Sequence, residues 1–514
     1  MPPSFQRPSS LTVSPLARAA RRWPDAPGLL WKDLSFDYRA MEQETRRAAS
    51  ALLSRGIAPG DRIAIDAPPG PAWVALLHAA PRVGAILVPL NSRLHPREQA
   101  EQIERIEPRW TLRGADGLRD FLDGAPEPDT VAPDTIATDQ TALLLFTSGT
   151  TGRPKIVPLT AGNLLASALA SNAALRLRPR DRWLACLPLF HVGGIGILWR
   201  CALAGASVLL LERFDAAGAE KAFESGGATI ASFVPVMLDR LLQRRVGEPL
   251  PPSVRAIVVG GGPARRASLD ACPAVLASYG ATETSSQVTL ARGEPRLPGA
   301  GRPLPRARLR IVGPDGATLP AEQVGWIEVR GPMVMRGYLD DTEPDAAAKA
   351  AGKGAAETAG GADTQAAGQG VAMTSGWFRT GDLGCLDAAG CLHVRGRRED
   401  LIVTGGENVY PAEVEGALAE DPSVADVLVI GIDDPSWGEV PAALLVLSRS
   451  APDGPREVLA RLESRLGRYK IPRRYRVVET IPRLANGKPD RVTARAWLTA
   501  ESWLTAESWP TAES

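Results

Sequence analysis

The sequence predicts an α/β protein in which a large N-terminal domain of stacked, mostly parallel sheets flanked by helices precedes a small α+β C-terminal domain. Three observations support this prediction. Short β-branched or Leu-rich runs alternate with helical patterns through roughly the first three-quarters of the chain, which is typical of buried parallel sheets. From about Ala300, short strands separated by Gly-containing turns indicate a small antiparallel β subdomain. After Arg397 a compact α+β pattern follows, and 514 residues are too many for one ordinary hydrophobic core.

Individual elements follow from the spacing of apolar residues. In the N-terminal part, strands are predicted by four apolar runs: Asp61–Asp66, Gly84–Leu90, Thr141–Gly149 and Arg255–Gly261. A helix is predicted over Met41–Gly56, where a glycine ends the pattern, and an amphipathic first helix over Leu16–Arg22. In the C-terminal part the expected order is helix, strand, strand, helix, over Pro411–Glu420, Val424–Ile432, Ala442–Ser448 and Pro455–Ile471.

The chain is expected to divide near Gly396. Residues 1–396 would form the N-terminal domain and residues 397–496 the C-terminal domain. Residues 342–375 are rich in Ala, Gly, Thr and Gln and poor in large apolar residues, so this insertion is expected to be a mobile loop. Residues 497–514 repeat the hexapeptide WLTAES, with WPTAES as the last copy. We interpret this segment as a frayed tail without function, because so few short units cannot stack into a solenoid.

Composition excludes several function classes. Lys and Arg number 59 against 58 Asp and Glu, so no overall charge points to nucleic acid, and an anionic ligand must be held locally. No apolar run approaches the roughly 20 residues that span a bilayer, and no apolar segment of a secretory signal follows the basic residues near the N-terminus. The 5 cysteines lack metal-ligand or redox spacing, which fits a reducing cytoplasm.

A loop suited to phosphate follows the strand predicted at Thr141. The run TSGTTGRPK combines hydroxyl groups, glycines and a lysine: Thr147, Ser148, Gly149, Thr150, Thr151, Gly152 and Lys155. Glycines let the backbone approach a ligand, hydroxyl and N–H groups donate to phosphate oxygens, and Lys155 adds positive charge. The Walker pattern is absent, because only two residues separate Gly149 from Gly152 and the lysine lies beyond them.

This run resembles the phosphate loop of the adenylate-forming enzymes, the superfamily of acyl-CoA synthetases, nonribosomal-peptide adenylation domains and beetle luciferases. Further motifs of that family follow in the same order and extend the resemblance over nearly the whole chain: YGATET (Tyr279–Thr284), GWFRTGDLG (Gly376–Gly384), GRREDLIVTGGENVYPAEVE (Gly396–Glu415) and PRLANGKPDR (Pro482–Arg491). The resemblance implies an ATP-dependent acid–CoA ligase that uses Mg²⁺ and coenzyme A. A carboxylate would attack the α-phosphate of ATP and release pyrophosphate, and the CoA thiol would then attack the acyl-adenylate.

The same resemblance assigns the residues around ATP. The loop would hold the β- and γ-phosphates, Glu283 would hold Mg²⁺, and Thr282 would donate to a phosphate or carboxylate oxygen. The implied adenosine contacts, from the adenine to the ribose, are Gly261, Gly262, Tyr279, Asp382 and Arg397.

The resemblance also implies that the C-terminal domain is mobile. Lys488 would stabilise the charge that develops between the carboxylate and the α-phosphate, and it is the residue expected to carry adenylation. The domain would then rotate about Glu399, at the position of the family's hinge, and replace Lys488 by a surface that faces coenzyme A. On that surface Gly405 and Gly406 would let the thiol arm pass.

The acid is indicated by the segment from His191 to about Thr289, which is similar to 2-succinylbenzoate–CoA ligases of menaquinone synthesis. His191 would gate the acyl pocket. That substrate has two carboxylates, and the one that is not activated needs a cation or polar donors. The candidates are Arg93, Arg200, Ser286 and Gln287, for each of which an ordinary surface or core role explains the sequence as well.

Several alternatives stay open. A general aryl or medium-chain acyl-CoA synthetase, or an enzyme that loads a carrier protein, would use the same ATP site. A non-catalytic homologue would be free to lose the charged site residues, yet all are present: Lys155, Glu283, Asp382 and Lys488. The expected partner is a small-molecule acid, with no nucleic acid and no integral membrane segment. A homo-oligomer is compatible with the sequence.

Overall fold

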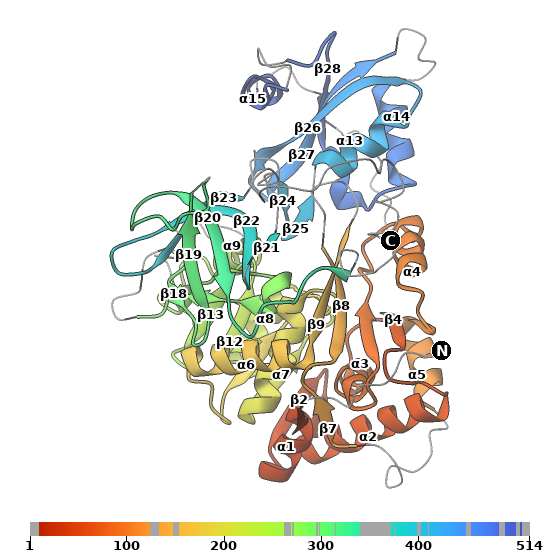
Figure 1. The fold of residues 1–514 in the computed structure, drawn as a ribbon, viewed down its shortest axis with the longest axis vertical. Coiled ribbons are helices and arrows are strands. Elements are labelled where there is room, and N and C mark those ends of the chain that lie inside the picture. Colours follow the sequence, from red (N-terminus) through yellow and green to blue (C-terminus); the bar gives the residue numbers. More distant parts are fainter. Residues whose placement is uncertain are drawn as a thin grey trace, which may run out of the picture. The chain divides into compact units, whose positions relative to one another are not determined.

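The computed structural model forms two compact units (Figure 1). It describes residues 10–123, 133–147, 154–261, 269, 272–293, 297, 299–313, 315–339, 372–374, 376–397, 402–409, 411–448, 454–482, 489–499 and 504–505. The first unit takes Met1–Leu90, Glu107–Phe146 and Ile156–Gly396, and the second takes Asn91–Ile106, Thr147–Lys155 and Arg397–Ser514. Mixed α/β layers make up the first unit and an α+β layer the second, so the predicted fold class is confirmed.

Parallel sheets form the larger part of the first unit. The sheet β14-β13-β12-β10-β11-β2-β3 is parallel except for the hairpin of β2 and β3. Its strands are Val275–Ala277, Ala256–Val259, Ile230–Phe233, Arg182–Ala185, Ser207–Leu210, Pro27–Trp31 and Leu34–Asp37, in that order. The sheet β6-β4-β5-β8-β9 comprises Trp110–Arg113, Arg62–Asp66, Ile86–Pro89, Thr141–Thr147 and Lys155–Thr160. β4 pairs in parallel with β5 and β6, and β5 with β8.

Helices connect these strands and cover the sheets. In the first unit they are α1 (Pro15–Arg22), α2 (Tyr38–Ser54), α3 (Pro71–Ala79), α5 (Gly114–Leu122), α6 (Ala161–Leu175), α7 (Val192–Ala204), α8 (Ala216–Glu224) and α9 (Pro235–Arg245). α2 begins where the Asp37 carboxylate accepts a hydrogen bond from the Ala40 amide at 2.7 Å, a standard N-cap. The predicted strands lie at β4, β5, β8 and β13, and the two predicted helices at α1 and α2, which confirms these elements.

A small antiparallel sheet completes the first unit, as the turn-rich sequence after Ala300 predicts. β19 (Arg308–Val312) pairs with β20 (Gly325–Arg330), which pairs with β22 (Trp377–Leu386). β21 (Ala372–Thr374) and β23 (Leu392–Arg397) also join β22. Three short hairpins or bridges join segments of the unit: β1 (Leu11–Val13) with β7 (Thr135–Ala137), β15 (Gly280–Ala281) with β16 (Ser286–Gln287), and β17 (Thr289–Leu290) with β18 (Arg302–Pro303).

The second unit is built on one mixed sheet. Its order is β25-β24-β27-β28-β29, and β26 pairs with β27. These strands are Glu407–Val409, Ile402–Thr404, Gly438–Leu447, Arg474–Val477, Leu504–Thr505 and, for β26, Val424–Asp434. Its helices are α4 (Pro96–Ile106), α13 (Pro411–Ala419), α14 (Pro455–Glu463) and α15 (Arg491–Thr499). Across all the described ranges, no helix combines the length and apolar content needed to cross a membrane.

Two predictions for this unit need correction. The helix expected over Pro455–Ile471 ends at Glu463, and a short 3-10 turn follows at Arg468–Lys470. The repeats are not a frayed tail throughout. The first copy supplies the last turn of α15, where Leu498 is fully buried, and the second supplies β29, which pairs with β28. Packing by the neighbours therefore decides the conformation of this hexapeptide.

Candidate functional site

The ends of the predicted phosphate loop lie on neighbouring strands. Thr147 is the last residue of β8, and Lys155 is the first residue of β9 in the same sheet. The loop between them therefore joins adjacent strands at the edge where β8 ends. Its remaining predicted ligands, Ser148, Gly149, Thr150, Thr151 and Gly152, lie outside the described residues.

Asn163 fixes the segment that follows β9. Its Oδ1 accepts hydrogen bonds from the backbone amide and the hydroxyl of Thr160, both at 2.9 Å, and so starts α6 with a capping box. Its Nδ2 donates to the carbonyl oxygens of Pro332 and Val334, again at 2.9 Å. This buried amide thus ties the start of α6 to the segment after β20. No periodic pattern in the sequence indicates that link.

Glu283 lies in a tight turn between β15 and β16. Ser285 and Ser286 hold φ values of 53° and 100°, which are costly for serine and mark a backbone fixed by its surroundings. The Glu283 carbonyl accepts from the Met335 amide at 2.8 Å, and its carboxylate oxygen Oε1 accepts from the Tyr338 hydroxyl at 2.8 Å. Thr282 stands beside it in the same 3-10 turn.

This carboxylate fits the predicted magnesium ligand. In the described part of the chain, no group of three or more His, Cys, Asp and Glu side chains could hold a metal by itself. Mg²⁺ keeps several waters and usually takes only one or two protein carboxylates beside substrate phosphates. A single glutamate is therefore a suitable donor set for a nucleotide-bound Mg²⁺, though not for a metal held by protein alone.

The predicted adenine and ribose residues meet in the structure. The Tyr279 hydroxyl donates to Oδ2 of Asp382 at 2.6 Å, and both side chains are buried. Asp382 lies in β22, 103 residues further along the chain. Gly261 follows β13 with a φ of 77°, a conformation that glycine adopts without strain. Gly262 and the Arg397 side chain lie outside the described residues.

Arg200 is a buried cation on α7. Its side chain is 2% exposed, and Nη2 donates to the Ser286 hydroxyl at 3.0 Å. Its Nε is buried with no hydrogen-bond partner, and among the residues that the structure describes no carboxylate acts on it. Burial lowers the pKa of the guanidinium to about 10. The charge also lies 5.6 Å from the Trp183 ring centroid.

Gly196 makes room for this guanidinium one helical turn earlier. A Cβ at Gly196 would lie 3.2 Å from Nη2 of Arg200, so a side chain there would crowd the cation. α6 and α7 pack side by side (Figure 1). The hydrogen bond between Arg200 and Ser286 joins two residues that are 86 positions apart in the sequence. The predicted acyl residues Arg200 and Ser286 are thus adjacent.

The other acyl candidates lie differently. Gln287 is buried, accepts a hydrogen bond from the Ser171 hydroxyl at 2.8 Å, and braces α6 rather than offering a free amide. His191 caps α7 and contacts the Phe190 ring edge-on, with 4.7 Å between centroids. Arg93 lies in the second unit, where its Nη1 is 2.5 Å from Oε1 of Glu407. The candidate role of Arg93 in holding a substrate carboxylate stays a prediction.

In the second unit, Gly405 and Gly406 form the two-residue turn of the β24–β25 hairpin. Their φ values are 56° and 87°, the pattern of a turn that demands positive φ at both positions. A Cβ at Gly405 would also lie 2.6 Å from the Trp437 ring. Turn geometry thus accounts for both glycines without a ligand. Lys488 and Glu399 lie outside the described residues.

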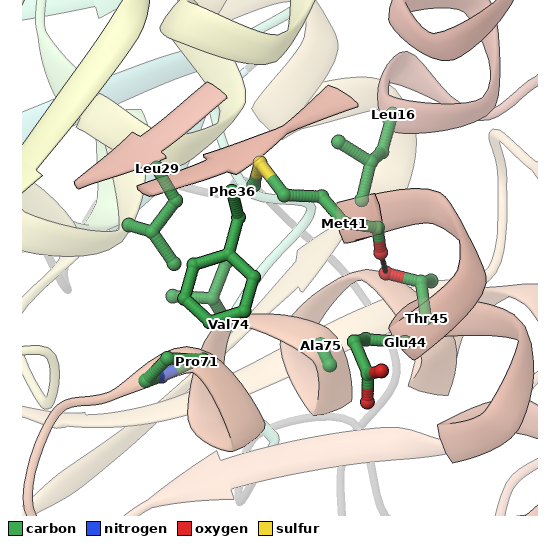
Figure 2. Close-up of a pocket in the computed structure, with 9 residues that line it drawn as sticks. All are labelled: Leu16, Leu29, Phe36, Met41, Glu44, Thr45, Pro71, Val74 and Ala75. Carbon is green, nitrogen blue, oxygen red and sulfur yellow. Dashed lines mark hydrogen bonds between the residues drawn. The ribbon is translucent and has the colours of Figure 1, made fainter. Parts of the chain in front are cut away.

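A hollow elsewhere in the first unit does not overlap the site. Figure 2 shows it between α1, α2, α3 and the β2–β3 hairpin, with Leu29, Phe36, Met41 and Val74 directed into it. Its lining is mostly apolar, with Glu44 and Thr45 as the polar members, and contains none of the predicted site residues. We assign it no ligand.

Comparison with known proteins agrees with the motifs. Residues 16–339 match the AMP-binding enzyme family, and residues 413–488 match the AMP-binding enzyme C-terminal domain. A 2-succinylbenzoate–CoA ligase of Bacillus velezensis is 36% identical over 500 residues, which cover 93% of this chain and 97% of that protein.

Solved structures give the same result. One is a double mutant of o-succinylbenzoate CoA synthetase from Bacillus subtilis bound with its product analogue OSB-NCoA. It is 32% identical, with a TM-score of 0.83, over 96% of this chain and 100% of that one. The complex of that enzyme with ATP and magnesium is 32% identical, with a TM-score of 0.67, over 95% and 100%. The resemblance predicted from the motifs is therefore confirmed, and the chain belongs to the AMP-binding enzyme family.

Proposed function

We propose that this chain is an ATP-dependent, AMP-forming acid–CoA ligase whose acid is 2-succinylbenzoate, in menaquinone biosynthesis. ATP, Mg²⁺ and coenzyme A would be its co-substrates and cofactor. Support comes from the family match, from the names of the Bacillus relatives, and from their complexes with ATP, magnesium and a CoA product analogue.

The observation that carries the choice of acid is the unpaired charge of Arg200. A buried guanidinium normally has a carboxylate partner, because an uncompensated buried charge costs several kcal/mol. In the described part of the chain Arg200 has only the neutral Ser286 hydroxyl and an aromatic ring. An acid with a second carboxylate would supply the missing partner, with Nε and the Ser286 hydroxyl as further donors. A monocarboxylic aryl or fatty acid would leave the cation buried and unpaired.

The ATP side of the site would work through positioning and charge. Lys155 and the loop would bind the phosphates, Tyr279 and Asp382 would hold adenine and ribose with Arg397, and Thr282 would donate to an oxygen at the reacting end. Mg²⁺, held by Glu283, would neutralise phosphate charge that otherwise repels the attacking carboxylate.

The C-terminal residues would complete the two half-reactions. We assign residues 397–496 to the small domain, because the last segment of the second compact unit begins at Arg397. We assign Glu399 to the hinge of this domain. Lys488 would serve adenylation, and the turn at Gly405 and Gly406 would face the CoA arm in the second step. His191 would gate the acyl pocket. The five buried free thiols and the use of ATP and CoA fit a cytoplasmic enzyme.

The test is pyrophosphate release across a panel of acids, with and without CoA. The most informative pair is 2-succinylbenzoate and 4-oxo-4-phenylbutanoate, which lacks only the ring carboxylate. A site built around a buried cation should prefer the diacid on the order of a hundredfold or more in kcat/KM. Faster turnover of benzoate or octanoate, with no signal from 2-succinylbenzoate, would refute the proposed acid. Release without any CoA-dependent thioester would refute the ligase.

A further inference from the structure

We propose that Tyr338 is a positioning residue for magnesium, because its hydroxyl fixes the carboxylate of Glu283 in the orientation that the metal needs. This inference rests on the proposed function, in which Glu283 holds the Mg²⁺ of the nucleotide. Tyr338 itself is not expected to contact ATP or the acid.

Two hydrogen bonds from residues 335–338 hold Glu283; we call this pair of contacts the clamp. The Tyr338 hydroxyl donates to Oε1 of Glu283 at 2.8 Å, and the Met335 amide donates to the Glu283 carbonyl at 2.8 Å. Tyr338 is 5% exposed, so its ring is held by packing and the hydroxyl has a defined position. Both the main chain and the side chain of Glu283 are therefore fixed from residues 335–338.

That segment is in turn anchored at three further points. The Asn163 side chain donates to the carbonyls of Pro332 and Val334, and the Ser285 hydroxyl donates to the carbonyl of Met333 at 2.8 Å. Ser285 belongs to the strained turn that carries Glu283. The clamp thus links the start of α6, which follows the strand leaving the phosphate loop, to the metal carboxylate.

The chemistry of Mg²⁺ explains why orientation would matter here. The ion demands nearly ideal octahedral geometry and gives up its waters reluctantly. In the described part of the chain no group of three or more His, Cys, Asp and Glu side chains surrounds a metal position, so a misplaced Glu283 carboxylate would have few protein ligands to compensate for it. Hydrogen bonds to a ligating carboxylate are known to matter for metal affinity, typically by 10- to 100-fold when the partner is removed.

The experiment compares wild type with Tyr338→Phe, which keeps the ring and deletes the donor. The Mg²⁺ concentration that gives half-maximal pyrophosphate release should rise about tenfold. Calorimetric titration with ATP should show a matching loss of affinity with Mg²⁺ present and little change with excess chelator. Tyr38→Phe is the matched control, because Tyr38 is also buried and its hydroxyl donates to the Ala206 carbonyl at 2.6 Å rather than to a carboxylate. It should leave the magnesium dependence unchanged.

Two further measurements keep the outcomes distinct. Thioester formation from supplied acyl-adenylate needs no nucleotide metal, so Tyr338→Phe should retain it within about twofold. Equal loss of both half-reactions would show a merely structural role and overturn the proposal. Glu283→Ala should shift the magnesium dependence further than Tyr338→Phe, and adding Tyr338→Phe to it should change nothing more. A shift in Glu283→Ala without one in Tyr338→Phe overturns the proposal alone, whereas no shift in either also overturns the metal role of Glu283.

Discussion

Replacing Arg200 by methionine should stabilise the fold while it destroys the use of the diacid. Burial lowers the pKa of the Arg200 guanidinium from 12.5 to about 10. At about 1.4 kcal/mol per pKa unit, the folded chain holds this charge at a cost of about 3 kcal/mol near neutral pH. The hydrogen bond to Ser286 and the contact with the Trp183 ring each return about 1 kcal/mol. Methionine, of similar length and apolar, should therefore raise the free energy of unfolding by about 1 kcal/mol.

Activity should change in the opposite direction. The ring carboxylate of 2-succinylbenzoate would lose its partner in a buried site, which costs about 2–5 kcal/mol. The kcat/KM for this acid should fall roughly 30- to 5,000-fold, whereas 4-oxo-4-phenylbutanoate should be used as well as before or better. The substrate preference of the variant would then be lost or reversed.

The assay is urea unfolding of both proteins, alongside kcat/KM for the two acids. Arg255→Met supplies a control of opposite sign, because Nη2 of Arg255 is paired with Oδ2 of the buried Asp181 at 2.6 Å. Removing that partner strands a buried carboxylate and should destabilise the fold by about 3–5 kcal/mol. If Arg200→Met destabilises as much as this control, or keeps its preference for the diacid, Arg200 has another partner and the reasoning fails.

Two other predictions concern stability. Burial, and to a lesser extent the charge of Arg82, lower the pKa of His78 to about 3. Below about pH 6.5 the unfolded chain therefore takes up a proton at this histidine that the folded chain does not. The free energy of unfolding consequently decreases as the pH is lowered. At pH 5 the loss of stability is about 2 kcal/mol. The measurement is the difference in unfolding free energy between pH 7 and pH 5, which should become smaller by this amount in His78→Gln. If the difference is unchanged in the variant, His78 is not the source of the acid sensitivity. At the C-terminus, a chain that stops after Thr499 should keep its turnover and lose little thermal stability, because, of the described residues, only the two-residue strand β29 is removed from the edge of the sheet. One that stops after Ala496 lacks the buried Leu498 and should lose about 2–5 kcal/mol, and equal stability of the two chains would contradict the packing of α15.

The sequence could predict elements whose signal is local. The runs that became β4, β5, β8 and β13 are apolar because both faces of a parallel sheet are buried, and that pattern needs no knowledge of neighbours. The helix expected up to Ile471 shows the limit. Its apolar spacing continues past Glu463, yet the chain turns at Gly467, where a Cβ would lie 2.8 Å from the Arg93 carbonyl. A contact between residues more than 300 positions apart cannot be inferred from the apolar spacing of a short stretch of sequence.

The repeats make the same point with matched sequences. The residues LT lie in α15 in the first copy and form β29 in the second. A propensity scale assigns the same preference to identical sequences. The conformation of the first copy is therefore decided by burial against β26 and β27, and that of the second by pairing with β28. The interpretation as a frayed tail overlooked that a repeated segment too short to form a solenoid can still pack against its neighbours.

Within the site, motifs marked candidate residues but did not indicate how their side chains are held. Tyr279 and Asp382 were both assigned to adenosine, yet their mutual hydrogen bond was not predicted, since 103 positions separate them. Tyr338 was missed altogether, because a single tyrosine after Gly337 has neither periodicity nor spacing that marks a function. The sequence marked Arg200 only as a candidate cation. Its burial without a carboxylate partner among the described residues, which the structure shows, is what makes it an argument for a diacid substrate.

The two sides of the first-unit site differ in how complete they are before a ligand arrives. On the side proposed to bind ATP, the carboxylates of Glu283 and Asp382 already accept hydrogen bonds from buried tyrosines, so their orientation would cost little on binding a nucleotide. On the acid side, Arg200 stays charged at the expense of stability. A diacid would relieve that cost as it binds, and a monoacid would not. The discrimination would therefore come mainly from the penalty for leaving a cation unpaired, which is how buried polar groups reject analogues that lack their partner.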